Sequence, residues 1–173
     1  PSEGVVALVP LLWGLGTSAG RARKWTLIRE HGSHFAWAIG AFIVASSPQL
    51  LYWQATTGHW LFYSYVNPGE GFDFATPHTL DYLFSARKGW FLYTPLMAIA
   101  LIRIVPLRKR FPALVPALVI YLLVDLWIVS SWSCWWYAGG SFSSRSMVPA
   151  YVLLALPLGA ALQWAWERKI TRN

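Results

Sequence analysis

The sequence predicts an all-α protein that crosses a membrane several times. The chain of 173 residues is 56% hydrophobic and only 12% charged, whereas a soluble domain is about 25% charged. Several apolar segments approach the roughly 20 residues that a helix needs to cross ~30 Å of hydrocarbon. Eleven of the fourteen Lys and Arg residues fall in three short clusters, which long apolar segments separate from one another. We therefore expect a single polytopic domain over 1–173, with about five membrane-spanning helices and one short interfacial helix.

Five apolar segments are the candidate spans. The first of them, 5–16, is short, and its missing turns would have to precede residue 1. For that reason we expect the chain to be the C-terminal part of a longer protein. The other candidate spans are 35–53, 90–107, 112–131 and 147–166.

Tryptophan placement agrees with these spans, because indole rings prefer the head-group level at both faces of a membrane. Six tryptophans fall at one set of span ends, and three fall at the other set. The first set is Trp53, Trp60, Trp90, Trp132, Trp135 and Trp136, and the second is Trp25, Trp164 and Trp166.

The basic clusters predict the orientation of the chain. They occupy residues 21–29, 103–110 and 168–172, and loops rich in Lys and Arg stay on the cytoplasmic side. The N-terminus of this chain would then lie outside and its C-terminus inside. A net charge of +7 could also suggest nucleic-acid binding, but the charge is divided among three loops and forms no continuous stripe. We exclude nucleic acid as a partner and expect the clusters to touch anionic lipid head groups.

The first outer loop, 54–88, is long enough to carry structure of its own. Thr76 and Pro77 resemble a helix start, with Thr as N-cap and Pro at the first helical position. The predicted interfacial helix therefore covers 77–86. Arg87 and Lys88 follow its C-terminal end, where the helix dipole favours cations.

The second outer loop, 132–146, contains the sequence WSCWWYAGGSFSSR. Gly139 and Gly140 allow a tight turn or a close approach of the backbone to a ligand. Arg145 follows directly before the last span, and arginine is suited to bidentate phosphate binding. A lone arginine at a membrane boundary is also a common head-group anchor, and both interpretations remain open.

Asp125 lies inside a candidate span, where an ionisable side chain predicts a functional role. By helical rise it stands about 20 Å above the inner boundary. Ser46, Ser47 and Gln49 reach a similar height on another span, beside Pro48. We expect a polar contact between these segments that lines a cavity opening outward. A satisfied packing contact is the alternative.

Acid–base and metal chemistry have few candidates in the outer loops. Transfer onto an alcohol needs a base near the acceptor oxygen, and the carboxylates available for this are Glu70, Asp73 and Asp81. His59 and His78 could join Glu70 and Asp73 around a divalent cation, but the spacing fits no recognised ligand pattern. The single Cys134 excludes an internal disulfide framework. We therefore expect no metal and no cofactor.

Three stretches of the chain resemble a known family. They are YWQATTGHWLFYSY (52–65), PHTLDYLFSARKGWFLYTPLM (77–97) and WWYAGGSFSSRSMVPAYVLLALPL (135–158). They are similar to the C-terminal portion of bacterial multi-spanning glycosyltransferases of the GT-C type, related to protein O-mannosyltransferases and to the lipid A aminoarabinose transferase. The resemblance implies many helices in a bacterial cytoplasmic (inner) membrane and an active site on the outer face. It also implies a polyprenyl-phosphate-linked sugar as donor, transferred with inversion.

The same resemblance implies roles for residues of the outer loops. Arg87, Lys88 and Arg145 would neutralise the donor phosphate as it leaves. Contacts to the sugar ring or the lipid would come from Trp135, Trp136, Tyr137 and His78. The catalytic aspartate of the family lies in an outer loop that has no counterpart here. No catalytic base is therefore assigned, and we expect this chain alone to be inactive.

Two other classes of protein remain open. A non-catalytic multi-pass subunit would bind lipid or other membrane subunits within a larger complex, and an aromatic outer face suits that role. A flippase or transporter would need paired polar groups at mid-bilayer and internal repeats. Asp125 is the one residue of the sequence that favours this last class.

Overall fold

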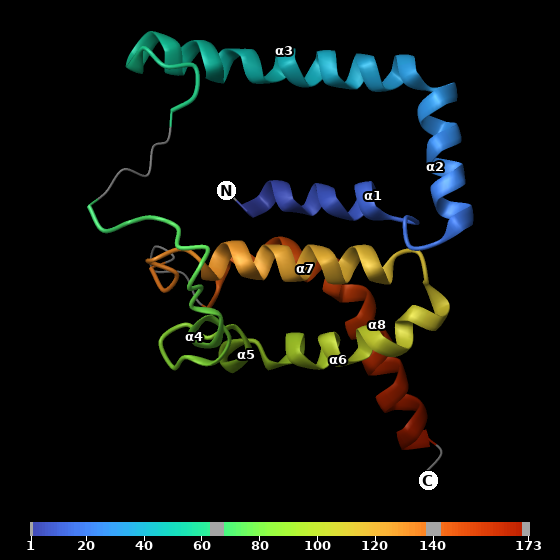
Figure 1. Ribbon diagram of the computed structural model, residues 1–173. Coiled ribbons are helices and arrows are strands. Elements are labelled where there is room, and N and C mark those ends of the chain that lie inside the picture. Colours follow the sequence, from blue (N-terminus) through green and yellow to red (C-terminus); the bar gives the residue numbers. More distant parts are fainter. Residues whose placement is uncertain (1, 63–67, 138–142, 171–173) are drawn as a thin grey trace.

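The structure is a computed structural model that describes residues 2–62, 68–137 and 143–170, and the described part is helical, with no strand in it (Figure 1). The predicted all-helical class is therefore confirmed. The helices are η1 (Ser2–Ala7), α1 (Leu8–Leu12), α2 (Ser18–Glu30), α3 (Gly32–Thr57), α4 (Thr79–Phe84), α5 (Trp90–Tyr93), α6 (Pro95–Arg110), α7 (Val115–Ser130), η2 (Arg145–Met147) and α8 (Val148–Ile170).

Two of these helical segments are long and apolar enough to cross a membrane. They are Gly32–Thr57, which is α3, and Arg145–Arg168, which joins η2 to α8. Val115–Ser130 is apolar but shorter. These helices agree with a membrane-associated protein, while the number of five spans stays a prediction.

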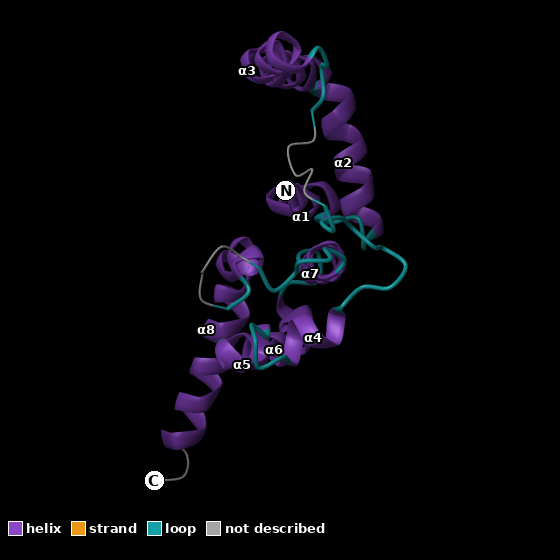
Figure 2. Cartoon of the chain, turned by 90° about the vertical axis from the view of Figure 1, so that its left-hand side faces the viewer, coloured by secondary structure: helices purple, strands orange, loops and turns teal. Residues whose placement is uncertain are grey.

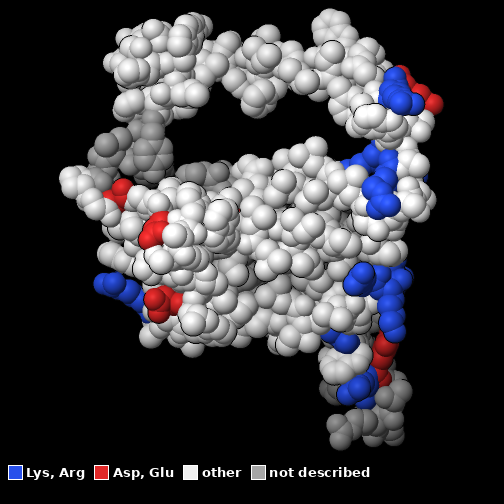
Figure 3. All heavy atoms as spheres, viewed as in Figure 1, with Lys and Arg blue, Asp and Glu red and all other residues white. Residues whose placement is uncertain are grey.

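Helix α3 stands apart from the rest of the molecule. None of its residues is buried, and α2 joins it to the body at one end (Figures 1 and 2). The space-filling view shows an open gap between α3 and the helices below it (Figure 3). A helix that is apolar on all sides is stable only when protein or lipid surrounds it, so α3 is suited to a bilayer.

The predicted span 90–107 is two helices in the structure. Helix α5 ends at Tyr93 and α6 begins at Pro95, and Thr94 between them has φ −134° and ψ 64°. The cause is Pro95, because a proline ring disfavours the helical conformation of the preceding residue. The prediction of one continuous helix was wrong at this point.

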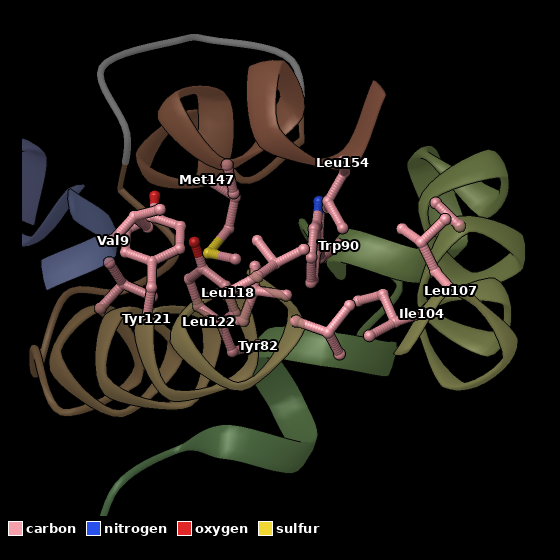
Figure 4. Close-up of a cluster of buried hydrophobic side chains, with 14 residues drawn as sticks. Val9, Tyr82, Trp90, Ile104, Leu107, Leu118, Tyr121, Leu122, Met147 and Leu154 are labelled. Carbon is pink, nitrogen blue, oxygen red and sulfur yellow. The ribbon is translucent and has the colours of Figure 1, made fainter. Parts of the chain in front are cut away.

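The core lies where α7 packs against α1, α4 and α6, and where α6 packs against α8 (Figure 4). Helix α7 contributes Leu118 and Tyr121, which are 1% and 0% exposed. Leu154 of α8 is also fully buried. Two aromatic side chains from the short helices complete this core, Tyr82 of α4 and Trp90 of α5.

The end of the molecule formed by α2 and by the C-terminal ends of α6 and α8 carries those residues of the basic clusters that the structure describes (Figure 3). The first cluster also stabilises α1, because Lys24 Nζ donates to the carbonyl oxygens of Pro10, at 2.8 Å, and of Leu11. Arg21 donates to the Leu15 carbonyl at 3.0 Å. The carbonyls of Pro10 and Leu11 lie in the last turn of α1 and lack partners within it. Lys24 thus caps α1, and Arg21 binds the turn that follows that helix.

Candidate functional site

The two outer loops predicted from the sequence pack against each other. A short antiparallel bridge pairs Phe72 of the first loop with Trp132 of the second. Ser133 strengthens the bridge, because its backbone N–H donates to the Gly71 carbonyl at 2.9 Å and its Oγ accepts from the Gly71 N–H at 3.0 Å. The first loop is thereby fixed to the C-terminal end of α7.

A tight turn between α4 and α5 carries Arg87 and Lys88. The Gly89 N–H donates to the Ser85 carbonyl at 2.7 Å, and the Arg87 N–H donates to Ser85 Oγ at 3.1 Å. The Arg87 guanidinium carbon lies 4.1 Å from the ring centroid of Trp136. A cation at this distance from an indole is attracted to its face. The turn of the first loop therefore seats an exposed guanidinium on an aromatic ring of the second loop.

A second contact ties Lys88 to the end of the second loop. Ser144 Oγ donates to the Lys88 carbonyl at 2.9 Å. Ser143, just before it, is 4% exposed and has a φ of 54°. Among the described residues, no other residue except glycine has a positive φ. A left-handed conformation costs a non-glycine residue about 1–3 kcal/mol and recurs at binding sites. The strained turn leads directly into Arg145, the exposed first residue of η2.

The three cations predicted to bind phosphate thus sit where the two loops meet. Arg87 and Lys88 come from the α4–α5 turn, and Arg145 comes from the residue that follows the Ser144 contact. Figure 3 shows basic atoms at this end of the molecule, opposite the end with the three clusters. Such a group of cations on hydrogen-bonded turns can receive an anion with two or more oxygens.

The predicted aromatic contacts divide into two kinds. Trp135 is half-buried and packs edge-on against Tyr82, with ring centroids 6.1 Å apart, so it belongs to the core. Trp136 lies under Arg87, and its ring meets that of Tyr137 at 6.0 Å and 89°. Tyr137 is 58% exposed. Trp136 and Tyr137 are therefore the two aromatic side chains placed to contact a ligand.

Asp73 has a local structural role. Its carboxylate accepts hydrogen bonds from the Ala75 N–H at 2.9 Å, from the Thr76 N–H at 3.1 Å and from the Thr76 hydroxyl. Thr76 therefore does not cap the interfacial helix, which begins at Thr79 after a His78 N-cap. The predicted helix 77–86 was too long at both ends, because Asp73 captures the residue expected to start it.

These hydrogen bonds hold the pKa of Asp73 below its ordinary value of 3.8, and the bond from the Thr76 hydroxyl has the largest effect. A carboxyl with a lowered folded-state pKa stabilises the fold above its unfolded pKa and loses that contribution as the pH falls through the folded pKa. We expect thermal unfolding of the wild type to lose stability below about pH 4 more steeply than Asp73→Asn. Parallel melting curves from pH 6 to pH 2.5 in one detergent check this. Superimposable pH dependences would contradict it.

The other two candidate acids are Glu70, which is half-buried, and Asp81, which is exposed on α4. His78 holds the first loop in place, because its backbone N–H donates to the Ser130 carbonyl at 2.8 Å. No three His, Cys, Asp or Glu side chains in the described part of the chain form a group that could hold a metal. The residues considered for a divalent cation, His59 and His78 with Glu70 and Asp73, are therefore not brought together.

Asp125 is buried in the core of α7, with 1% of its surface exposed. The Tyr121 hydroxyl donates to its Oδ2 at 3.3 Å. Gln49 lies on α3, which stands on the far side of α1 from α7 (Figures 1 and 2). The predicted contact of Asp125 with Gln49, Ser46 and Ser47 is therefore not formed. The alternative, a packing contact within the core, agrees with the tyrosine hydrogen bond.

Tyr82 is, like Asp125, a buried residue with an ionisable group. It lies on α4 at 1% exposure, and its hydroxyl points toward the same region as that of Tyr121, beside Met147 (Figure 4). Burial raises the pKa of the Tyr82 phenol above its ordinary value of 10.0, and the hydroxyl therefore stays neutral. Tyr82 is thus a neutral side chain of the core, where its ring packs against Trp135.

Sequence reasoning missed the residues that join the loops. Ser133 and Ser144 supply the side-chain links, and buried Gly89 permits the turn that carries the cations. A glycine directly after a basic pair, and serines on both sides of a glycine pair, were the available signals. The chain matches no protein-family model, no curated protein and no solved structure.

Proposed function

We propose that the chain is a segment of a membrane glycosyltransferase that transfers a sugar from a polyprenyl-phosphate donor to an acceptor on the outer face of an inner membrane. The observation that carries the proposal is the meeting of the two outer loops. It gathers Arg87, Lys88 and Arg145 where the loops join, with Arg87 on the half-buried ring of Trp136 and the exposed ring of Tyr137 next to it. A cationic group next to aromatic faces suits a ligand that joins a phosphate to a sugar and an isoprenoid.

In this proposal the cations act on the leaving group. The acceptor oxygen bonds to the anomeric carbon while the bond between that carbon and the phosphate oxygen breaks. The electron pair of the broken bond stays on the polyprenyl phosphate, and positioned cations stabilise the charge that develops there. The proton of the acceptor passes to a base. Asp73 is a poor base because three hydrogen bonds stabilise its ionised form.

The arrangement of charge supports the proposed orientation. The basic clusters lie at the end formed by α2 and the C-terminal ends of α6 and α8, and the two-loop site lies at the other end (Figure 3). With the clusters in the cytoplasm, the site faces outward. Helices α3 and α8 then run between the two faces.

A binding experiment tests the proposal without requiring turnover. The full chain in phosphatidylcholine nanodiscs is titrated with undecaprenyl phosphate. We expect Arg87→Ala/Arg145→Ala to weaken binding about tenfold or more, because each charge-assisted hydrogen bond contributes about 1.5–3 kcal/mol and 1.4 kcal/mol is a factor of ten. The matched control, Arg108→Ala/Arg110→Ala, removes the same charge from the opposite end.

We expect that control to change the affinity by less than about threefold, since its charges lie more than a Debye length of ~8 Å away. Equal losses in the two double variants would show that the net charge of the chain attracts the lipid. No measurable binding by the wild type would remove the proposal for this chain.

One observation favours the alternative, a non-catalytic subunit that binds lipid or partner proteins. Helix α3 has no buried residue over its 26 residues, and in a complex a neighbouring subunit could cover it. A stable partner that co-purifies with the chain, together with no binding of undecaprenyl phosphate, would favour this alternative. Binding that depends on Arg87 and Arg145 would favour the transferase.

A further inference from the structure

Trp164 of α8 holds two arginines at the end of the molecule opposite the two-loop site. The guanidinium carbons of Arg103, from α6, and of Arg168, from α8, each lie 4.2 Å from its ring centroid. The two carbons can therefore be no more than twice that distance apart. A single indole thus fixes two guanidinium groups that come from different helices.

Positive charge dominates the surroundings of this group. Among the described residues of α6 and α8, Glu167 is the one carboxylate, and it accepts a hydrogen bond from Gln163 Nε2 at 2.9 Å. The last turn of α6 adds Arg108, Lys109 and Arg110. Like charges held this close repel one another. An anion that contacts both guanidinium groups would offset that repulsion.

We propose that Arg103, Trp164 and Arg168 form a binding site for the phosphate of an anionic phospholipid in the cytoplasmic leaflet. Guanidinium groups bind phosphate oxygens in a bidentate manner at about 2.8 Å. Two such groups on one ring are preorganised, so less side-chain entropy is lost when the phosphate binds. The apolar surface of α6 and α8 beside the site would contact the acyl chains.

The depth of the site in the membrane favours the phosphate of a lipid over a free phosphate ion as its ligand. Arg103 lies seven residues before the end of α6, which is about 10 Å along a helix. It is half-buried and directs its guanidinium to an indole ring, and indoles mark the head-group level. A phosphate attached to an acyl chain is delivered to that depth, whereas inorganic phosphate would have to lose its hydration to reach it.

This inference goes beyond the proposed function and depends only on the proposed membrane orientation. The site involves the C-terminal part of α8, which lies at the opposite end of the molecule from the turn between α4 and α5 (Figure 1). The two sites are tested with different lipids and different variants. Either one can therefore fail while the other holds.

Native mass spectrometry of the full chain in detergent, titrated with a phosphatidylglycerol, tests the site. We expect Arg103→Gln/Arg168→Gln to weaken binding of the first lipid about tenfold or more. The matched control Arg108→Gln/Arg110→Gln removes two charges from the same end, and we expect a change of less than about threefold, typical of diffuse attraction. Arg103→Lys/Arg168→Lys keeps the charge but loses the bidentate geometry, and should fall between the two.

Three outcomes would overturn the proposal. The first is an equal loss in the two glutamine variants, and the second is equal binding of phosphatidylcholine. In the third, inorganic phosphate displaces the phosphatidylglycerol at equal concentration, which would assign the site to a free anion. The thermal midpoint of each variant in phosphatidylcholine alone reports whether it folds. If the glutamine pair unfolds, the lysine pair, which retains the long side chains, decides the outcome.

Discussion

Replacing Trp90 by alanine is expected to destabilise the protein by about 3–5 kcal/mol, the range for truncating a buried aromatic side chain. Trp90 is 2% exposed. Its ring stacks on Phe91 at 5.0 Å and on Tyr151 at 6.5 Å, and its Nε1 donates to the Tyr151 hydroxyl at 3.2 Å. Alanine would remove the contact that joins α5 to α8 and leave a cavity in the core.

Equilibrium unfolding in detergent measures this loss, with two variants for comparison. Trp90→Phe keeps most of the ring and loses the hydrogen bond, so we expect about 1 kcal/mol. Trp37→Ala on α3 removes the same side chain at 80% exposure and should change stability by about 0.5 kcal/mol or less. Equal effects of Trp90→Ala and Trp37→Ala would contradict the placement of Trp90 in the core.

The environment of Trp90 could not be predicted from the sequence. Its position at the end of an apolar segment predicted a ring at the head-group level, as for the other tryptophans at span ends. The structure instead buries it in the core, on a short helix that the break at Thr94 separates from α6. The signal for that break, Pro95 directly after Thr94, is present in the sequence. Its consequence for Trp90 depends on Tyr151, 61 residues away.

For the candidate site, the sequence indicated the residues but not how they come together. Local patterns were enough to select Arg87, Lys88 and Arg145, because cations next to apolar segments on the less basic side of the chain stand out. Their assembly depends on the contact between Ser144 and the Lys88 carbonyl, which spans 56 residues. No periodicity links positions so far apart. The sequence selected Asp125 by its place in an apolar segment, but it did not indicate the hydrogen bond from Tyr121, one helical turn away.

Replacing Gly89 by alanine should disrupt the turn that carries two of the three cations. A Cβ on Gly89 would lie 2.6 Å from both the N and the O of Ser85 and 2.7 Å from the carbonyl carbon of Phe84. These are backbone atoms, which cannot rotate away as a flexible side chain does. Gly89 is needed here for close approach, since its φ of −56° suits any residue. We expect a loss of about 3 kcal/mol, near the upper end for overpacked sites.

The same substitution should weaken the binding of undecaprenyl phosphate about tenfold or more, because opening the turn moves Arg87 off Trp136 and the Lys88 carbonyl away from Ser144. Gly40→Ala is the matched control. A Cβ there meets nothing within 4 Å, and glycine-to-alanine in a helix stabilises by about 0.5–1 kcal/mol. Unfolding curves and lipid titrations on both variants separate the two effects.

The stability and binding results together show whether undecaprenyl phosphate binds at the α4–α5 turn. A Gly89→Ala protein that is destabilised yet binds undecaprenyl phosphate normally would place the lipid site away from the α4–α5 turn and remove Arg87 and Lys88 from it. Loss of binding at temperatures where the variant remains folded would show that the geometry of this turn, and not the positive charge alone, recognises the phosphate. Arg87 and Lys88 are unchanged in this variant, so net charge could not account for that loss.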